Sequence, residues 1–162
     1  MARHLRQLRP VELGFADTAP VRLSFTADLG VPRGALYRAL ADEVAEWPRW
    51  FTAVTRITPL GGGSARRVEL KGGGVFSETI VAAHPGERYT YRVDETNAPG
   101  ITAMVEDWNL SLAPSGAARA RWTVAVDGPL TARTVVRMSR FGLGRAFREA
   151  MRNLDRRLRA RV

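Results

Sequence analysis

The sequence predicts an α+β fold in which a curved antiparallel sheet of about seven strands wraps around a long C-terminal helix. From residue 54 to residue 126, apolar and polar residues alternate with a period of two, which indicates half-buried strands. Near residue 130 the period changes to that of an amphipathic helix. The segments between the strands are short, and short connections favour antiparallel neighbours because a parallel crossover needs about a dozen residues.

The first strand is expected at Val21–Asp28, where apolar and polar residues alternate before Gly30 breaks the pattern. Two short helices should follow: Pro32 suits the first turn of one, and Asp42 can cap the second, which ends near Trp47-Pro48. The other six strands are expected at residues 54–58, 66–70, 75–83, 88–94, 102–112 and 118–126. Each gap between these strands contains glycine, proline or asparagine, which favour turns.

The terminal helix is expected over residues 134–160, with an apolar stripe on one side. Gly142 and Gly144 should bend it or let its backbone approach a neighbour, because each glycine weakens a helix by about 1 kcal/mol relative to alanine. The stripe consists of Val136, Leu143, Phe147, Met151, Leu154 and Leu158. A sheet must bury one face, and this is the one large helix that can cover it.

The length of 162 residues fits one domain, which we expect at residues 20–162 after an N-terminal extension of residues 1–19. The chain has no cysteine, which excludes disulfides and thiolate metal ligands. No stretch has the ~20 apolar residues of a membrane span, and the basic N-terminus lacks the apolar core of a signal peptide. We therefore expect a cytoplasmic protein without a metal or other cofactor.

The net charge of +9 comes almost entirely from the C-terminal segment. Residues 1–128 carry 15 basic and 14 acidic side chains, whereas residues 129–162 carry 10 basic and 2 acidic ones. The basic helix has three interpretations: a solvated face, a surface that contacts anionic membranes transiently, or a nucleic-acid site. No aromatic side chains alternate with the arginines as a single-strand platform requires, so specific nucleic-acid binding is not expected.

Several short segments, spread over residues 20–160, are similar to those of the START-like helix-grip superfamily, in particular its polyketide cyclase/dehydrase and lipid-transport family. They are Phe25-Thr26-Ala27, Leu40-Ala41-Asp42, Trp47-Pro48-Arg49-Trp50, Gly74-Val75-Phe76-Ser77-Glu78 and His84-Pro85-Gly86-Glu87-Arg88-Tyr89. The resemblance implies a helix-grip fold with a hydrophobic ligand cavity between the sheet and the terminal helix. It implies no single activity, because one fold supports many functions.

Strand phase identifies Glu106 as the candidate catalytic or ligand-binding group. Met104, Glu106 and Trp108 share one strand face with Leu110 and Leu112, which should point Glu106 toward the helix. A carboxylate on such a face binds a ligand, catalyses a reaction or pairs with an arginine. Further residues expected to line a ligand site are Phe76, Tyr89, Tyr91, Met104, Trp108, Trp122 and Phe147; ordinary core packing is the alternative for these.

The other polar residues and the glycine-rich segments give weaker evidence for a functional site. Glu78 could join Glu106 as a second inward carboxylate, but a solvated position is favoured because the phase of its strand is ambiguous. His4 and His84 have no partner at metal-ligand or catalytic-triad spacing. The glycine triplets lack the Gly-Lys-Ser/Thr of a phosphate-binding loop, so neither nucleotide nor metal binding is predicted.

Two main functions follow from these residues, and a third is a membrane-associated lipid-transfer protein that uses the arginine-rich helix. The first is binding of a small hydrophobic or aromatic, lipid- or polyketide-like molecule in a cavity between the sheet and the C-terminal helix. The second is a polyketide cyclase or dehydratase that uses Glu106 and a pocket tyrosine for acid–base chemistry. Convergent ionisable groups in the cavity favour the enzyme, and a wholly apolar cavity favours the carrier. A homodimer is compatible with either function.

Overall fold

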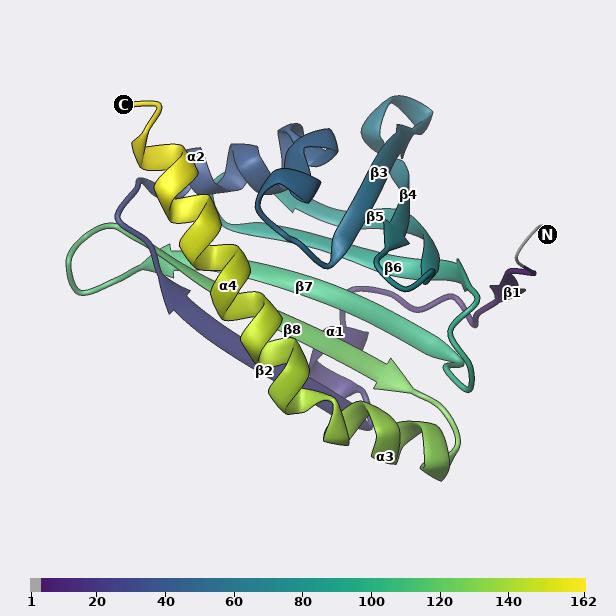
Figure 1. Cartoon of the computed structure of the whole chain (residues 1–162). Coiled ribbons are helices and arrows are strands. Elements are labelled where there is room, and N and C mark those ends of the chain that lie inside the picture. Colours follow the sequence, from purple (N-terminus) through teal and green to yellow (C-terminus); the bar gives the residue numbers. More distant parts are fainter. Residues whose placement is uncertain (1–3) are drawn as a thin grey trace.

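The computed structural model describes residues 4–162, which form an eight-stranded antiparallel sheet with helices against both faces (Figure 1). The strand order is β2-β8-β7-β6-β5-β4-β3, and the two-residue β1 pairs with β6. The strands are β1 (Arg6–Gln7), β2 (Val21–Asp28), β3 (Val54–Leu60), β4 (Ala65–Leu70), β5 (Val75–His84), β6 (Arg88–Thr96), β7 (Ala103–Leu112) and β8 (Ala118–Asp127). The predicted α+β helix-grip fold is confirmed, and the seven predicted strands lie within two residues of their expected bounds.

Three short helical segments, rather than two, follow β2. They are α2 (Arg33–Tyr37), the π-helical turn η1 (Arg38–Asp42) and the 3₁₀ helix η2 (Val44–Arg49). Pro32 precedes α2 in an extended conformation instead of lying in its first turn. Asp42 does not cap η2, because Glu43 occupies the position before that helix and makes no side-chain capping bond.

The C-terminal helix is divided in two, α3 (Leu130–Met138) and α4 (Arg140–Arg159), and α4 crosses the inner face of the sheet diagonally (Figure 1). The division falls at Ser139 and not at Gly142 or Gly144, where a bend was predicted. Gly144 instead allows close packing on β2: a Cβ atom there would lie 3.1 Å from the ring of Phe25.

The main core lies between the inner sheet face and α4. Its centre is aromatic: the rings of Trp47 and Trp50 are 4.9 Å apart, and Trp108 stacks on Trp122 at 5.6 Å. From α4, the apolar stripe contributes the buried side chains of Phe147, Met151, Leu154 and Leu158. The predicted helix face is therefore the one that packs on the sheet.

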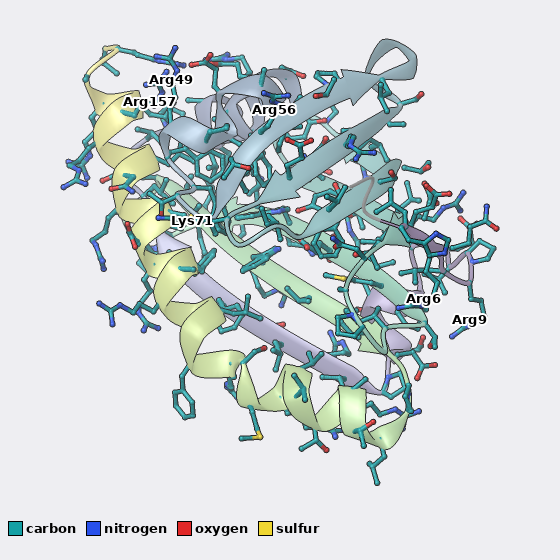
Figure 2. The ribbon with its side chains drawn as sticks, turned by 45° about the vertical axis from the view of Figure 1, so that its right-hand side comes forward. Arg6, Arg9, Arg49, Arg56, Lys71 and Arg157 are labelled. Atoms are coloured by element: carbon teal, nitrogen blue, oxygen red, sulfur yellow. The ribbon has the colours of Figure 1, made fainter. Side chains whose placement is uncertain are left out.

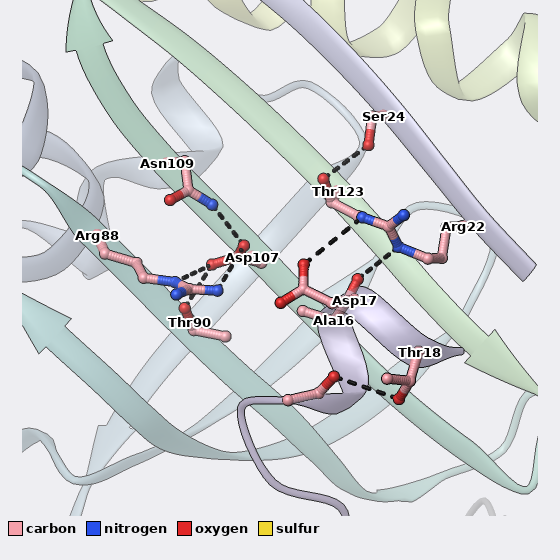
Figure 3. Close-up of polar contacts among 11 residues, drawn as sticks. Ala16, Asp17, Thr18, Arg22, Ser24, Arg88, Thr90, Asp107, Asn109 and Thr123 are labelled. Atoms are coloured by element: carbon pink, nitrogen blue, oxygen red, sulfur yellow. Dashed lines mark hydrogen bonds and ion pairs between the residues drawn. The ribbon is translucent and has the colours of Figure 1, made fainter.

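The outer face of β7 and β8 is covered by the N-terminal segment. The short helix α1 (Phe15–Thr18) buries Ala16 against this face, and Val11 and Ala19 join it in a second apolar cluster with Val105. Arg22 of β2 fastens α1 by donating to the carbonyl oxygen of Ala16 at 2.6 Å (Figure 3). Residues 6–19 thus complete the outer side of the sheet.

A polar network lies beside α1 on the same outer face. The carboxylate of Asp107 in β7 accepts hydrogen bonds from Arg88, Thr90 and Asn109, and Ser24 pairs with Thr123 nearby (Figure 3). Asp107 and Glu106 are neighbours in sequence and therefore point to opposite faces of β7. This network is separate from the carboxylate that faces the helix.

The tryptophans before β3 are predicted to be major contributors to stability. Trp47 is 3% exposed and Trp50 is 1% exposed, so truncation of either leaves a large hole in the core. We expect Trp47→Ala and Trp50→Ala each to lower the free energy of unfolding by about 3–5 kcal/mol in denaturant titrations. The control is Phe141→Ala, which truncates a ring that is 85% exposed and should change little. Equal stability of all three variants would contradict this placement.

Candidate functional site: a cavity under the C-terminal helices

A cavity of about 260 Å³ lies between the inner face of the sheet and the segment where α3 meets α4. Val136, Ser139, Leu143 and Ala146 close it on the helical side. The rest of its wall comes from η2, the strands and the connections before β3 and β7. It consists of Trp47, Phe51, Ala53, Val54, Arg66, Val68, Leu70, Phe76, Glu78, Tyr91, Ile101, Met104, Glu106, Trp122, Val124 and Val126. The wall is therefore apolar except for a few polar groups from neighbouring strands.

Strand register brings Glu106 and Tyr91 together, because they are direct partners in the β6–β7 ladder. The Tyr91 hydroxyl donates to Glu106 Oε2 at 2.6 Å, and Trp122 Nε1 of β8 donates to the same oxygen at 3.0 Å. Trp108 Nε1 in turn donates to the Tyr91 hydroxyl at 3.3 Å. The inward phase predicted for Glu106 is correct, and the side chain is held by two donors rather than by an arginine.

The second carboxylate oxygen of Glu106 is the one that a ligand could reach. No protein hydrogen bond to Oε1 is found among the described residues. Oε1 is also not fully buried. Within residues 4–162 the sole fully buried side-chain polar atom without a partner is Arg66 Nη1, so an unpartnered Oε1 must be partly accessible. Glu106 is half-buried and lies on the cavity wall, so this oxygen is its accessible part.

Burial controls the protonation of this pair. Desolvation raises the pKa of Glu106, and the hydrogen bond from Tyr91, the charge of Arg66 and the hydrogen bond from Trp122 offset only part of that rise. Desolvation and the Glu106 charge also raise the pKa of Tyr91 well above its usual value. Tyr91 consequently keeps its proton and acts as a donor, while Glu106 holds a proton more readily than an exposed glutamate.

A second polar pair, Arg66 and Glu78, joins two further strands at the cavity wall. The residues are direct partners in the β4–β5 ladder, and Arg66 Nε donates to Glu78 Oε2 at 2.6 Å. Their side chains are 2% and 3% exposed. The guanidinium carbon lies 3.9 Å from the ring centre of Tyr91 and 4.6 Å from that of Trp47, so cation–π contacts support the buried charge.

The solvated position predicted for Glu78 is wrong. The register of β5 shifts between Ser77 and Glu78 and again between Ile80 and Ala82, and these irregularities obscure the simple alternation of the strand. The structure places Phe76 and Glu78 on the cavity side. Desolvation raises the pKa of Glu78 to about 7, although the adjacent Arg66 charge opposes the shift.

The residues predicted to bind a ligand divide into two groups. Phe76, Tyr91, Met104, Glu106 and Trp122 lie on the cavity wall. Tyr89, Trp108 and Phe147 are buried in the core and do not line the cavity. Their large rings support the wall from behind: Trp108 stacks on Trp122, and Phe147 lies 5.9 Å from the same ring.

Arg66 is the polar cavity residue that sequence reasoning missed. Its position relative to Val68 and Leu70, at intervals of two, would have placed it on their apolar face. All three residues line the cavity. In a chain with 25 basic residues, 24 of them arginine, composition did not distinguish Arg66 from the many arginines at the surface.

The remaining polar candidates lie elsewhere. His4 and His84 are exposed and neither contributes to the cavity wall. Over residues 4–162, no cluster of three or more His, Cys, Asp or Glu side chains could hold a metal ion. In the same range, no helix is long and apolar enough to span a bilayer.

The arginines at the C-terminal end of α4 are largely used in ion pairs. Arg157 and Arg49 lie near each other and share the carboxylate of Glu46, at 2.7 and 3.0 Å (Figure 2). Arg161 contacts Glu43 at 2.9 Å. These pairs neutralise two of the C-terminal arginines, Arg157 and Arg161, by contact with the segment that precedes β3.

An open antiparallel sheet that grips a C-terminal helix over an internal cavity defines the START-like class of proteins. The solved structure of a START superfamily protein from Mycobacterium smegmatis superposes with a TM-score of 0.64 at 12% identity, over 82% of this chain and 98% of that one. An aromatase/cyclase from Streptomyces superposes with a TM-score of 0.71 at 15% identity, over 87% and 94% of the two chains. At these identities the similarity shows the fold.

The sequence is specific enough to assign the family. Residues 20–159 match the family described as polyketide cyclase/dehydrase and lipid transport, and the chain belongs to that family. An uncharacterized protein of Mycobacterium tuberculosis is 36% identical over 151 residues, which cover 90% of this chain and 89% of that protein. A protein of Mycobacterium bovis, also uncharacterized, matches equally well. The family predicted from the sequence is thereby confirmed.

The pKa of Glu78 leads to a prediction about stability and pH. The pKa rises from 4.5 to about 7 on folding, so the folded chain binds this proton more tightly than the unfolded chain. The resulting stabilisation is complete below about pH 4.5 and is lost as the pH rises through about 7. The Glu78→Gln variant cannot titrate at this position. Between pH 4.5 and 8, the advantage of the wild type over Glu78→Gln in free energy of unfolding should fall by at most about 3 kcal/mol.

Urea titrations of both proteins at pH 4.5, 6 and 8 measure this difference. Comparison at each pH cancels the titration of all other groups, because the two proteins share them. An advantage that grows with pH would show instead that the ionised Glu78 gains more from Arg66 than it loses on burial.

Proposed function

We propose that the domain formed by residues 20–162 binds one small hydrophobic or aromatic molecule in the cavity beneath α3 and α4. The observation that supports this most is the cavity itself: about 260 Å³, walled by aliphatic and aromatic side chains, with the few polar groups of Arg66, Glu78, Tyr91 and Glu106. Ligand sites typically combine such a wall with a small number of polar groups that orient the ligand. The family assignment supports the same function.

The volume limits the class of ligand. Typical ligand pockets measure about 300–1,000 Å³, and this cavity lies just below that range. A molecule of two or three fused rings, or one short acyl chain, suits the volume, whereas a phospholipid with two long chains does not. The ligand is then polyketide- or fatty-acid-like in size.

The polar end adds a chemical requirement. Glu106 Oε2 already accepts from Tyr91 and Trp122, which leaves Oε1 for the ligand. A phenolic or alcoholic hydroxyl can donate to this oxygen when Glu106 is ionised. When Glu106 is protonated, it can donate to a ligand carbonyl instead. The proposed ligand is therefore an apolar molecule with one hydroxyl or carbonyl group.

Catalysis by a polyketide cyclase or dehydratase remains the alternative function. Glu106 and Tyr91 converge within hydrogen-bond distance, as an acid–base pair requires. The Tyr91 proton is already donated to Glu106 Oε2, however, and the same oxygen accepts from Trp122, so only Oε1 is open to a ligand. This fixed arrangement suits a binding wall better than proton transfer. The binding function is accordingly preferred, and Glu106 is proposed as its orienting group.

Filling the cavity should abolish binding without unfolding the protein. Ala146 lines the cavity from α4, and Ala146→Met adds three heavy atoms to the space. Titration with N-phenyl-1-naphthylamine, a small apolar dye that fluoresces in dry sites, should show saturable binding to the wild type. The affinity of Ala146→Met should fall at least tenfold, or about 1.4 kcal/mol. Ala160→Met, at an exposed position near the end of α4, is the control.

Native mass spectrometry of freshly purified protein provides a second measurement of occupancy. A small molecule bound at a ratio of one to one is expected, and Ala146→Met should retain less of it. A wild type that carries no molecule and binds no dye would overturn the proposed function. Equal dye binding by both variants would place the ligand outside this cavity.

The orienting role of Glu106 can be tested with a matched pair of ligands. 2-Naphthol and 2-methylnaphthalene have similar shapes, but only the first has a hydroxyl that can donate to Glu106. We expect the wild type to prefer 2-naphthol about tenfold at pH 8, and Glu106→Gln to lose most of that preference. Calorimetric titration gives the affinities, and thermal denaturation checks that Glu106→Gln remains folded. An unchanged preference in a folded variant would remove Glu106 from the binding site.

A further inference from the structure

The outer side of the cavity's helical wall carries large apolar side chains that no part of the described chain covers. The exposed fractions are 73% for Leu130, 66% for Val135, 75% for Met138 and 85% for Phe141. These four residues are here called the outer patch. They account for four of the seven exposed large hydrophobic residues in the described chain, gathered within 12 positions. Exposed apolar groups that gather in one place mark sites of association with a protein or a membrane.

The helix that carries most of the outer patch is weakly anchored. None of the nine residues of α3 is buried, although the helix is strongly amphipathic in sequence. At 100° per residue, Leu130, Val135 and Met138 fall within one arc of about 140°, which is the side turned away from the sheet. One side of α3 thus faces the sheet, and the opposite side exposes apolar side chains that no described residue covers.

Unpaired positive charge surrounds the outer patch. Residues 129–148 contain five arginines and no acidic residue. Arg133 contacts Asp127 at 3.0 Å, but in the described chain no ion pair holds Arg137, Arg140, Arg145 or Arg148. The opposite end of α4 differs in part: Arg157, Arg159 and Arg161 each contact a carboxylate, whereas no ion pair is found for Arg152 or Arg156 in the described chain. Exposed apolar groups and free guanidinium groups thus coincide at one end of the molecule.

We propose that α3 and the N-terminal part of α4, as far as Arg148, form a docking surface for an anionic lipid bilayer. A bilayer interface can accommodate both features at once: the outer patch enters the boundary between headgroups and acyl chains, and the guanidinium groups meet lipid phosphates. The binding is shallow and in the plane of the membrane. The remaining face of α4 is occupied by the sheet, so deeper insertion would require the core to open.

A second copy of the chain fits the surface less well. A two-fold dimer through the outer patch would place the arginines of one copy against those of the other, since such an interface uses the same surface twice. Like charges at short distance oppose that assembly. An acidic protein could also pair with the arginines. The experiment therefore uses vesicles of lipid alone, so that binding to them reports a bilayer and not a protein partner.

The location of the docking surface connects it to the cavity. Val136, Ser139 and Leu143, on the inner side of the same helical segment, line the cavity, while the outer patch lies on the other side. Only this one layer of helix separates the cavity from a docked bilayer. Transfer of a ligand from the bilayer across this helical layer into the cavity rests on the proposed ligand-binding function. Docking of the protein on the bilayer does not rest on it.

The test measures binding of the full chain to vesicles. Large unilamellar vesicles of phosphatidylcholine and phosphatidylglycerol at a ratio of 7:3 should bind the wild type in flotation assays, and pure phosphatidylcholine vesicles should bind it at least tenfold more weakly. Binding should weaken as salt rises, because salt screens the charges. The Met138→Ser/Phe141→Ser variant should lose at least tenfold in partition coefficient. Arg145→Gln/Arg148→Gln should lose about half of the salt dependence, because Arg137 and Arg140 remain.

Matched controls keep the result specific. Leu60→Ser/Leu112→Ser removes two exposed leucines, 47% and 58% exposed, from strand ends far from α3 in the sequence, and should bind vesicles like the wild type. Met138→Ser/Phe141→Ser should still bind 2-naphthol without vesicles, which separates failure of docking from failure of the cavity. The proposal is overturned if the wild type does not bind anionic vesicles, or if both double serine variants bind alike. A concentration-dependent dimer that Phe141→Ser dissociates, with no vesicle binding, would assign the outer patch to a second copy.

Discussion

One α-helix cannot cover a sheet of seven paired strands, and this mismatch of widths shapes the molecule. Strands spaced about 4.8 Å apart make a sheet roughly 29 Å wide, whereas a helix with its side chains is about 10–12 Å across. Helix α4 packs on part of the inner face and the short segments α2 to η2 pack on another part. The cavity occupies what they leave, against β3 to β8. Its existence therefore follows from the element count, and its walls follow from how the elements are arranged.

Charged groups are buried at the wall of this cavity, and specific contacts support them. Removing Arg66 and Glu78 from water carries a large desolvation cost, and their 2.6 Å contact offsets that cost only in part. Three aromatic rings around Arg66 add cation–π support, and two donors hold the separate carboxylate of Glu106. Hydrophobic residues of similar volume would stabilise the domain at least as well. The polar row is therefore weak evidence for stability, and it supports the binding site proposed above.

The proposed ligand site and the proposed docking surface share one structural element. The break at Ser139 separates α3, which has no buried residue, from α4, which buries Phe147, Met151, Leu154 and Leu158 of its stripe. A segment with few buried contacts opens at a lower free energy than the core to which it is attached. Within residues 4–162, α3 is thus the cavity wall without a buried residue, and it also bears most of the outer patch.

The sequence by itself determined the elements and their faces, because both depend on local spacing. The alternation in residues 102–112 and 118–126 was sufficient to place Glu106, Met104 and Trp122 on the inner face, and turn residues were sufficient to place the strand ends. The pattern failed where backbone register shifts, as at Glu78, and where many residues of one type hid a single unusual one, as at Arg66. Family membership could also be predicted, from segments around Trp47-Pro48.

Only the tertiary structure decided which inward side chains line the cavity and which are core. Tyr89 and Tyr91 share one strand face and one residue type, yet Tyr91 reaches the cavity and Tyr89 does not. The difference arises from what lies above each residue, and that depends on how η2, α3 and α4 divide the sheet surface between them. Contacts between elements distant in sequence carry no periodic signal, so strand phase predicts the face of a residue but cannot predict its neighbour.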